Sequence, residues 1–353
     1  MDDFLKRRRE ARQRAAAFWQ SWQWEQPWQA GGGCVALVNS GNYLLHHYFP
    51  GVFLQAVSDY VVDADAKFQV AFSSGGRLEP MADAVLLAEA APPGLPFGVQ
   101  ALLRRCRAAE LPQRKAGFGK TQLSGSQFQV ACAPGSDGLV HLQVFVNDNP
   151  AGTDADDRRL AVWLLLAQAL GQWDLNVKTG CVELVEKPPR GALPLAELPA
   201  AFDKLWRAQL GHNGVYPSGE AEFRVYGAEN DDGEPAKILV RNESAASLLG
   251  RADLAWCLSV RCEVYDDMSQ ALAQELAHEF SGCVGQHEQG ILTAMLADAE
   301  KGEYTAFAMV AEPEGLWEKV REITARYERL DARANCVFDP SWRHYRLRSE
   351  EPV

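Results

Sequence analysis

The stretch "LAWCLSVRCEVYDDMSQALAQELAHEF", residues 254–280, changes its periodicity half-way, and this change decides the fold class. In its first half Leu258, Val260 and Cys262 fall on one face, with polar residues between them, which predicts a β-strand. From Asp267 to Phe280 the pattern predicts a helix. A strand that leads directly into a helix indicates a sheet with helices packed on it.

The sequence around this stretch repeats the same combination of strands and helices. A predicted hairpin precedes it, with "AEFRVYG" and "AKILVR" on either side of a turn built on Asp232-Gly233. The strand "YTAFAMVA", a helix over 314–329 and the strand "DARANCVF" follow it. Residues 281–299 are compatible with either strand or helix.

The first two thirds of the chain have the same mixed character. Alternating and helical patterns follow one another, and two alternating runs on either side of "PGSDG" predict a second hairpin. The predicted helices are 2–28, 53–64, 80–90, 154–171 and 194–211, and the predicted strands are 67–72, 97–104, 126–133, 139–146 and 177–186.

These patterns predict an α+β protein of three small modules, each a mostly antiparallel sheet with helices on one face. A chain of 353 residues exceeds one ordinary core. Punctuated joints place the modules at 1–110, 118–211 and 218–353.

The composition restricts the possible partners. A formal charge of −12 argues against binding nucleic acid or an anionic membrane, and it suits a basic protein partner. The charged start of the chain is unlike a signal peptide, and no apolar run is long enough to span a membrane. The 8 cysteines are spread singly along the chain, which favours reduced thiols in the cytoplasm.

The last third resembles a bacterial domain-of-unknown-function family that is distantly similar to the regulator of ribonuclease E inhibitor B. The resemblance rests on "WCLSVRCEVYDDM", "SGCVGQ", "EYTAFAMVA" and the terminal "FDPSWRHYR". It implies a ferredoxin-like module that acts by contacting another protein. The first two thirds are similar to uncharacterised bacterial proteins, on "FWQSW" and "PLAELPAAFDKLW", and this similarity implies no chemistry.

The segment "RKAGFGKTQLSG", residues 114–125, ends like a phosphate-binding P-loop, with Gly119-Lys120-Thr121. A P-loop also needs a glycine five residues before Gly119, where this chain has Arg114, and it needs a buried strand before and a helix after. The flanking residues provide neither. We therefore predict a flexible connector over 107–120 that ends in a Gly-rich turn, and no nucleotide site.

Cysteines and histidines offer two candidate sites. His278, Cys283 and His287 supply three potential ligands where a structural zinc site needs four, so we expect a capping histidine and a buried cysteine instead. Cys257 and Cys262 are five residues apart in one strand, which places their sulfur atoms on opposite faces. We expect both to be packing thiols.

Two acidic clusters have the composition of a cation site but not its spacing. The first, Asp154, Asp156 and Asp157, is explained by capping of the helix that follows it. The second, Glu229 to Glu234, is explained by a solvated hairpin tip.

A dispersed Ser-His-Asp device remains an alternative. "SSGG" (73–76) follows a strand, His141 alternates within a strand, and His46-His47 follows "GNYLL", but no Gly-x-Ser-x-Gly elbow is present.

Four of the 10 tryptophans lie close together, at positions 19, 22, 24 and 28. We predict that Trp19 and Trp22 dock the first helix on its own sheet rather than stack on bases or sugars. Trp24 and Trp28 leave this stripe, and as an exposed pair they would form a protein-binding anchor.

We assign no catalytic, cofactor-binding or metal-ligating residue and expect no cofactor. The expected function is that of a non-enzymatic cytoplasmic interaction protein, a regulator or an immunity-type inhibitor, that uses an acidic surface to bind an unidentified protein. The alternatives are a hydrolase with a dispersed active site and a structural homo-oligomer.

Overall fold

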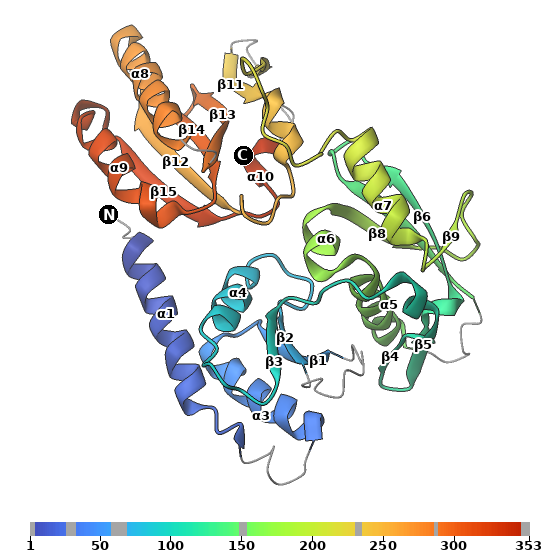
Figure 1. The fold of residues 1–353 in the computed structure, drawn as a ribbon. Coiled ribbons are helices and arrows are strands. Elements are labelled where there is room, and N and C mark those ends of the chain that lie inside the picture. Colours follow the sequence, from blue (N-terminus) through green and yellow to red (C-terminus); the bar gives the residue numbers. More distant parts are fainter. Residues whose placement is uncertain are drawn as a thin grey trace. The chain divides into compact units, whose positions relative to one another are not determined.

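The computed structural model describes residues 4–25, 33–57, 69–147, 154–229, 235–285 and 289–346 (Figure 1). Its small sheets are mostly antiparallel and alternate with helices, so the predicted α+β class is confirmed. Two compact units are present: Met1–Leu5 with Gly211–Val353 form unit 1, and Lys6–Leu210 form unit 2. The finer division of unit 2 into two modules stays a prediction. Among the described residues, no helix has the length and hydrophobicity needed to cross a bilayer.

The first part of unit 2 is a three-stranded sheet in the order β1-β2-β3. β2 and β3 are parallel, and α4 provides the crossover that a parallel pair requires. The elements are α1 (Phe4–Ser21), α3 (Gly33–Tyr48), β1 (Phe53–Val57), β2 (Gln69–Ser73), α4 (Met81–Glu89) and β3 (Gly98–Ala101).

Aromatic side chains of α1 dock on this sheet, as predicted. Phe18, Trp19 and Trp22 are buried, and the Phe18 ring lies 5.9 Å from that of Phe72 in β2. Trp19 Nε1 donates a hydrogen bond of 2.8 Å to the carbonyl of Leu87 in α4. The tryptophan stripe is therefore core material.

The second tryptophan pair was predicted to be an exposed anchor. Trp24 is half-buried instead, because its ring packs against Phe97 at 5.8 Å. Trp28 lies outside the described residues.

The predicted helix over 53–64 is wrong in its first part. Residues 53–57 form the strand β1, which pairs antiparallel with β2 and buries Leu54. Pairing with β2, the next described strand along the chain, overrides the local pattern here. The helix α3 was not predicted, and His46 and His47 lie in its last turn.

The second part of unit 2 is a four-stranded sheet in the order β8-β7-β6-β9, with helices packed on it. β6 and β7 form the predicted hairpin, and α5 and α7 match the predicted helices. The elements are β6 (Phe128–Pro134), β7 (Val140–Val146), α5 (Ala155–Leu170), α6 (Gln172–Val177), β8 (Thr179–Leu184), β9 (Leu193–Pro194) and α7 (Leu198–Lys204), followed by a π-helical turn (Leu205–Gln209).

The P-loop-like segment forms a small β-hairpin. β4 (Lys115–Phe118) pairs with β5 (Thr121–Ser124), and Gly119 occupies the turn at φ +54°. A Cβ on Gly119 would collide with the carboxylate of Asp157, a group that repels phosphate. The flexible connector predicted for 107–120 is wrong, because a 3-10 turn (Ala108–Gln113) buries Leu111 completely.

Arg105 links several helices of unit 2. Its Nη1 and Nη2 each donate a hydrogen bond of 2.8 Å to the carboxylate of Asp203 in α7, and its Nε donates one of 2.7 Å to the carbonyl of Leu170 in α5. Nη2 also contacts Asp174 in α6, which Lys178 holds at 2.6 Å. Burial alone would raise the pKa of Asp203, but the hydrogen bonds and charge of Arg105 outweigh it and lower this pKa.

Unit 1 is built on a six-stranded antiparallel sheet in the order β10-β11-β13-β14-β12-β15. From β12 onward its elements follow in the order β-α-β-β-α-β. Residues 281–299, which the sequence left open between strand and helix, contain both: α8 ends there and β13 begins there. The elements are β10 (Phe223–Glu229), β11 (Pro235–Asn242), β12 (Trp256–Glu263), α8 (Asp267–Val284), β13 (Gly290–Asp298), β14 (Glu303–Val310), α9 (Pro313–Ala325), β15 (Arg333–Phe338) and α10 (Arg343–Arg346).

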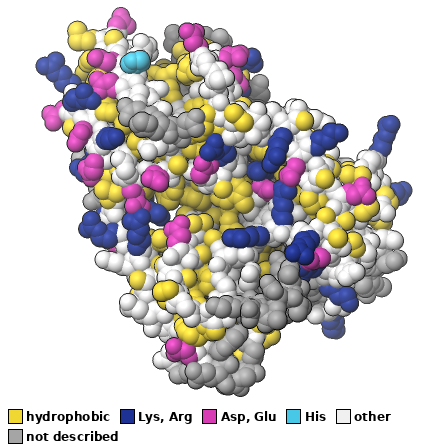
Figure 2. Space-filling view, viewed as in Figure 1, with side chains coloured by type: hydrophobic (Ala, Val, Ile, Leu, Met, Phe, Trp, Pro, Cys, Tyr) yellow, Lys and Arg dark blue, Asp and Glu magenta, His cyan; other side chains and the backbone are white. Residues whose placement is uncertain are grey.

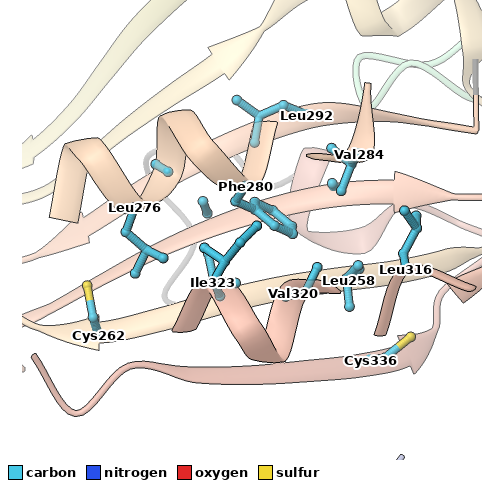
Figure 3. Packing of buried hydrophobic residues seen from close by; sticks show 14 of the residues in the cluster. Leu258, Cys262, Leu276, Phe280, Val284, Leu292, Leu316, Val320, Ile323 and Cys336 are labelled. Atoms are coloured by element: carbon cyan, nitrogen blue, oxygen red, sulfur yellow. The ribbon is translucent and has the colours of Figure 1, made fainter. Parts of the chain in front are cut away.

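The core of unit 1 lies between this sheet and the helices α8 and α9. Figure 3 shows Leu258 of β12 beside Val320 of α9, with Phe280 of α8 close to both. Phe4, from the other end of the chain, completes this core with its ring 5.1 Å from that of Trp317.

Candidate functional site

The C-terminal motif "DPSWRHYR", residues 339–346, covers part of the sheet face opposite α8 and α9. Trp342 is fully buried there, and its Nε1 donates a hydrogen bond of 2.9 Å to the carbonyl of Leu254. The hydroxyl of Tyr345 donates one of 3.1 Å to the carbonyl of Asn242. Asp339 begins the segment and accepts a 2.7 Å bond from the backbone N–H of Arg343. The motif therefore serves as a plug on the sheet.

His344 lies at the centre of this plug. Its ring stacks on Phe307 at 4.7 Å, its Nε2 lies 2.9 Å from Thr293 Oγ1, and its Nδ1 lies 3.3 Å from Asp339 Oδ2. The Thr293 hydroxyl donates to the carbonyl of Phe307, so it accepts a hydrogen from Nε2. A carboxylate can only accept, so this contact requires a hydrogen on Nδ1, and His344 and Asp339 form an ion pair when both imidazole nitrogens are protonated.

Cys257, His344 and Asp339 have the residue types of a nucleophilic triad but not its geometry. In a triad the nucleophile and the orienting carboxylate contact different imidazole nitrogens. Here Cys257 Sγ lies 3.5 Å from Nδ1, the nitrogen that also contacts Asp339. Cys257 is 5% exposed, and burial raises its pKa well above the ordinary value, which keeps it a thiol. Cys257 is therefore a buried thiol within a packed cluster and is not available as a nucleophile.

The two strand cysteines lie on opposite faces, as predicted. Cys262 belongs to the core under α8 and α9, where burial raises its pKa to about 11, whereas Cys257 faces the plug. Both are packing thiols.

Substitution of Asp339 by asparagine is expected to make the stability of unit 1 less sensitive to acid. Burial alone would raise the pKa of Asp339, but the hydrogen bond and charge of His344 outweigh it, so this pKa lies below 3.8. The ionised carboxylate therefore stabilises the fold above about pH 4, by about 1–2 kcal/mol, and loses this contribution as the pH falls through its folded pKa.

Urea unfolding of the wild type and the Asp339→Asn variant from neutral pH down to about pH 2.5 measures this effect. The gap between the two free energies of unfolding should shrink as the pH falls. A gap that stays constant over this range would contradict the ion pair.

A groove of about 1170 Å³ follows the edge strand β15. Among its described lining residues there is neither a histidine nor a cysteine, and Arg261 and Arg321 are engaged with Glu303 at 3.0 Å and Glu318 at 3.6 Å. Its hydroxyl and carboxylate side chains are Ser259, Thr305, Thr324, Glu328 and Asp331, and Asp331 is paired with Arg333. Its lining consists of Ser259, Arg261, Thr305, Phe307, Trp317, Arg321, Thr324, Ala325, Glu328, Asp331, Ala332, Arg333, Ala334 and Asn335.

The candidate metal ligands are not brought together by the described structure. His278 is exposed on α8 but lies six residues before the helix ends at Val284, so the predicted capping role is wrong. Cys283, predicted to be buried, is half-buried five residues later, about 140° around the helix. His287 lies outside the described residues. In the part of the chain that the structure covers, no group of three or more histidine, cysteine or acidic side chains is arranged to hold an ion.

The first acidic cluster caps α5, as predicted. Asp154 Oδ1 accepts hydrogen bonds from the backbone N–H groups of Asp156 at 2.8 Å and Asp157 at 3.1 Å. Of the second cluster, residues 230–234 are not described.

The serines and the histidine of the alternative hydrolase site are separate. Ser74 is fully buried and accepts a 2.9 Å hydrogen bond from Gln172 Nε2, and Ser73 is also buried, so neither is available to a substrate. His141 pairs instead with Asp137, at 3.2 Å between Nε2 and Oδ1. A Cβ on Gly180 would lie 2.6 Å from this ring, so glycine there leaves room for it.

The junction between β12 and α8 exposes two large apolar side chains. Tyr265 is 70% exposed and Met268 is 71% exposed. Glu263, Asp266 and Asp267 surround them in the sequence and are also exposed. Figure 2 shows acidic side chains, with basic ones among them, over the part of unit 1 that contains α8.

The turn between β13 and β14 adds a further carboxylate at the same end of the sheet. Glu263 is paired with Glu303 in the β12–β14 register, and Val264 donates a 2.8 Å backbone hydrogen bond to Gly302. This pairing places Glu300, which is exposed, beside the junction. We refer to Glu263, Tyr265, Asp266, Asp267, Met268 and Glu300 together as the acidic tip.

The carboxylates of the acidic tip differ in their local roles. Asp266 caps α8, because its Oδ1 accepts a 2.7 Å hydrogen bond from the backbone N–H of Ser269, and this bond lowers the pKa of Asp266. Asp267 lies in the first turn, where the helix dipole favours a negative charge. Glu263 and Glu300 form no ion pair with any residue that the structure describes. Their charge is therefore available to a partner.

The acidic tip was not predicted from the sequence, although "VYDDM" is part of the family-like stretch. The signal was an aromatic residue and a methionine at a strand–helix junction, outside both hydrophobic periodicities.

No protein-family model matches the chain, and no curated protein matches it either. The resemblance to the family related to the ribonuclease E regulator thus stays a prediction.

Proposed function

We propose that this chain is a non-enzymatic cytoplasmic interaction protein, a regulator or an immunity-type inhibitor, that binds a basic protein partner through the acidic tip. The observation that carries the proposal is the exposure of Tyr265 and Met268, 70% and 71%, next to carboxylates without an ion pair among the described residues. Exposed apolar side chains do not stabilise the fold of unit 1. The free energy of burying them can therefore contribute to binding a partner.

The residue types at the tip suit a protein interface. Tyrosine is enriched among the residues that dominate binding energy, and methionine adapts its shape to a partner. Carboxylates around them raise the association rate with a basic partner and disfavour acidic ones. With a net charge of −12, nucleic acid and anionic lipid are poor partners.

The element order of unit 1 supports the ferredoxin-like character that the resemblance implies. The order β-α-β-β-α-β from β12 to β15 is that of the split β-α-β motif. The acidic tip lies at the first strand-to-helix connection of this motif, and connections carry binding residues more often than strands do.

Simultaneous replacement of Tyr265 and Met268 by alanine is expected to weaken partner binding at least about tenfold, because both side chains lose their buried contact. Affinity purification with mass spectrometry from the native cytoplasm identifies the partner. Titration of the purified pair then gives the dissociation constants of the wild type and the variant.

A matched control is Tyr43→Ala, which removes an aromatic side chain that is 83% exposed in unit 2. It should bind like the wild type, and added salt should weaken binding of both. Equal affinities for wild type and tip variant would refute the assigned surface. Turnover of generic ester, phosphate or nucleotide substrates that survives repurification would refute the non-enzymatic function.

A further inference from the structure

The sheet of unit 1 extends beyond the helices that cover it. α8 and α9 pack on β12 to β15. β10 and β11 extend the same sheet sideways, beyond β13. On the helix-bearing face of these two strands Phe223 is 44%, Val225 is 66% and Ile238 is 39% exposed. An apolar surface of this kind at a sheet edge is a template for pairing with another chain.

β10 is also an edge strand with regular geometry up to its bulge at Ala228. Within the described residues it pairs only with β11. From Phe223 to Gly227 it contains no proline or lysine, and the register with β11 is continuous. Of the devices that usually protect an edge strand, these five residues carry only the charged side chain of Arg224, and the bulge follows them at Ala228.

The hydrogen-bond pattern shows which backbone groups face outward. Glu243 donates a 2.8 Å backbone hydrogen bond to the carbonyl of Glu222, so Glu222 faces β11. Residues of an antiparallel strand alternate between facing one neighbour and facing the other. The N–H and C=O groups of Phe223, Val225 and Gly227 therefore point away from β11.

These three residues are complementary to themselves when two strands run antiparallel. With Val225 opposite its own copy, Phe223 lies opposite Gly227 of the second copy, and its ring can cover the bare backbone there. On the other sheet face Arg224 lies opposite Tyr226, a favourable cation–π pair. The neighbouring register, with Phe223 opposite Val225, places Arg224 against Arg224 and is disfavoured.

We infer that two copies of this chain associate through their β10 strands, antiparallel and centred on Val225, to form one continuous sheet. The dimer pairs the outward backbone groups of Phe223, Val225 and Gly227 with those of the second copy. It also joins the two uncovered apolar faces. The inference is independent of the acidic tip.

The test is sedimentation or light scattering of the full chain between about 1 and 100 µM. We expect a concentration-dependent dimer that added salt strengthens, because salt screens the repulsion between two chains of charge −12. Binding through the acidic tip responds to salt in the opposite direction. The two proposals can therefore fail separately.

Substitutions at Val225 test the register. Val225→Lys and Val225→Glu should each raise the dimer dissociation constant at least about tenfold, because like charges then face each other across the axis. An equimolar mixture of the two variants should recover the dimer, since lysine then faces glutamate. Val215→Lys, at a residue that is 64% exposed and lies outside β10 in the sequence, is the matched control and should dimerise like the wild type.

A wild type that stays monomeric over this range would overturn the inference, as would a Val225→Lys variant that dimerises normally. Failure of the mixed variants to associate would overturn the register centred on Val225.

Discussion

Replacement of Trp342 by alanine is expected to lower the free energy of unfolding of unit 1 by about 3–5 kcal/mol. The indole is fully buried, and its ring lies 5.7 Å from that of Tyr345. Alanine leaves a cavity under the plug and leaves the carbonyl of Leu254 without its hydrogen-bond donor. Hydrogen exchange of peptides from β12 and β14 under increasing denaturant measures this loss in unit 1 alone.

Trp342→Phe separates packing from hydrogen bonding. Phenylalanine retains most of the apolar contact but has no N–H group, so we expect a loss of about 1–2 kcal/mol. If the alanine and phenylalanine variants were equally stable, the cavity would not be the main cause of the loss in free energy of unfolding. A loss below about 1 kcal/mol for alanine would mean that the plug does not stabilise the sheet.

This expectation gives the C-terminal motif a structural meaning. Trp342 fills the sheet face, Tyr345 hydrogen-bonds to Asn242, and Asp339 starts the helix α10 and holds His344. The terminal stretch on which the predicted resemblance partly rests is therefore explained by folding. A short motif of this kind need not mark a functional site.

The sequence predicted elements well where one periodicity is local and complete. The alternation in residues 256–263 identified both faces of β12, and acidic N-terminal residues with a C-terminal glycine identified α5. β1 was missed because its five residues acquire strand geometry only by pairing with β2. The role of Phe4 in unit 1 was also inaccessible, since more than 250 residues of chain separate it from Trp256 and more than 310 from Trp317, its contacts in space.

The candidate site shows the same limit. All members of the acidic tip except Glu300 lie within residues 263–268, so most of the tip is a local feature of the sequence. Glu300 joins it only through the register of β12, β14 and β13, which fixes where the turn after β13 lies. Exposure itself depends on which face each helix buries, and no residue pattern states that directly.

Replacement of Arg105 by alanine is expected to destabilise unit 2 by about 2–3 kcal/mol, less than the 3–5 kcal/mol typical of breaking a fully buried ion pair. The guanidinium is 29% exposed, and solvent compensates part of the loss. Its removal leaves the carboxylate of Asp203 without its bidentate partner and the carbonyl of Leu170 without a donor. Hydrogen exchange of peptides from α5 and α7 reports the change.

Arg105→Lys is the informative control for this network. Lysine keeps the charge but cannot donate two parallel hydrogen bonds to Asp203 while also reaching Leu170. We therefore expect it to lose about half of the stability that alanine loses. Asp174 should be affected least, because Lys178 still holds it at 2.6 Å. If lysine restored full stability, charge alone would hold these helices together, and the fork-shaped geometry of Arg105 would have no role.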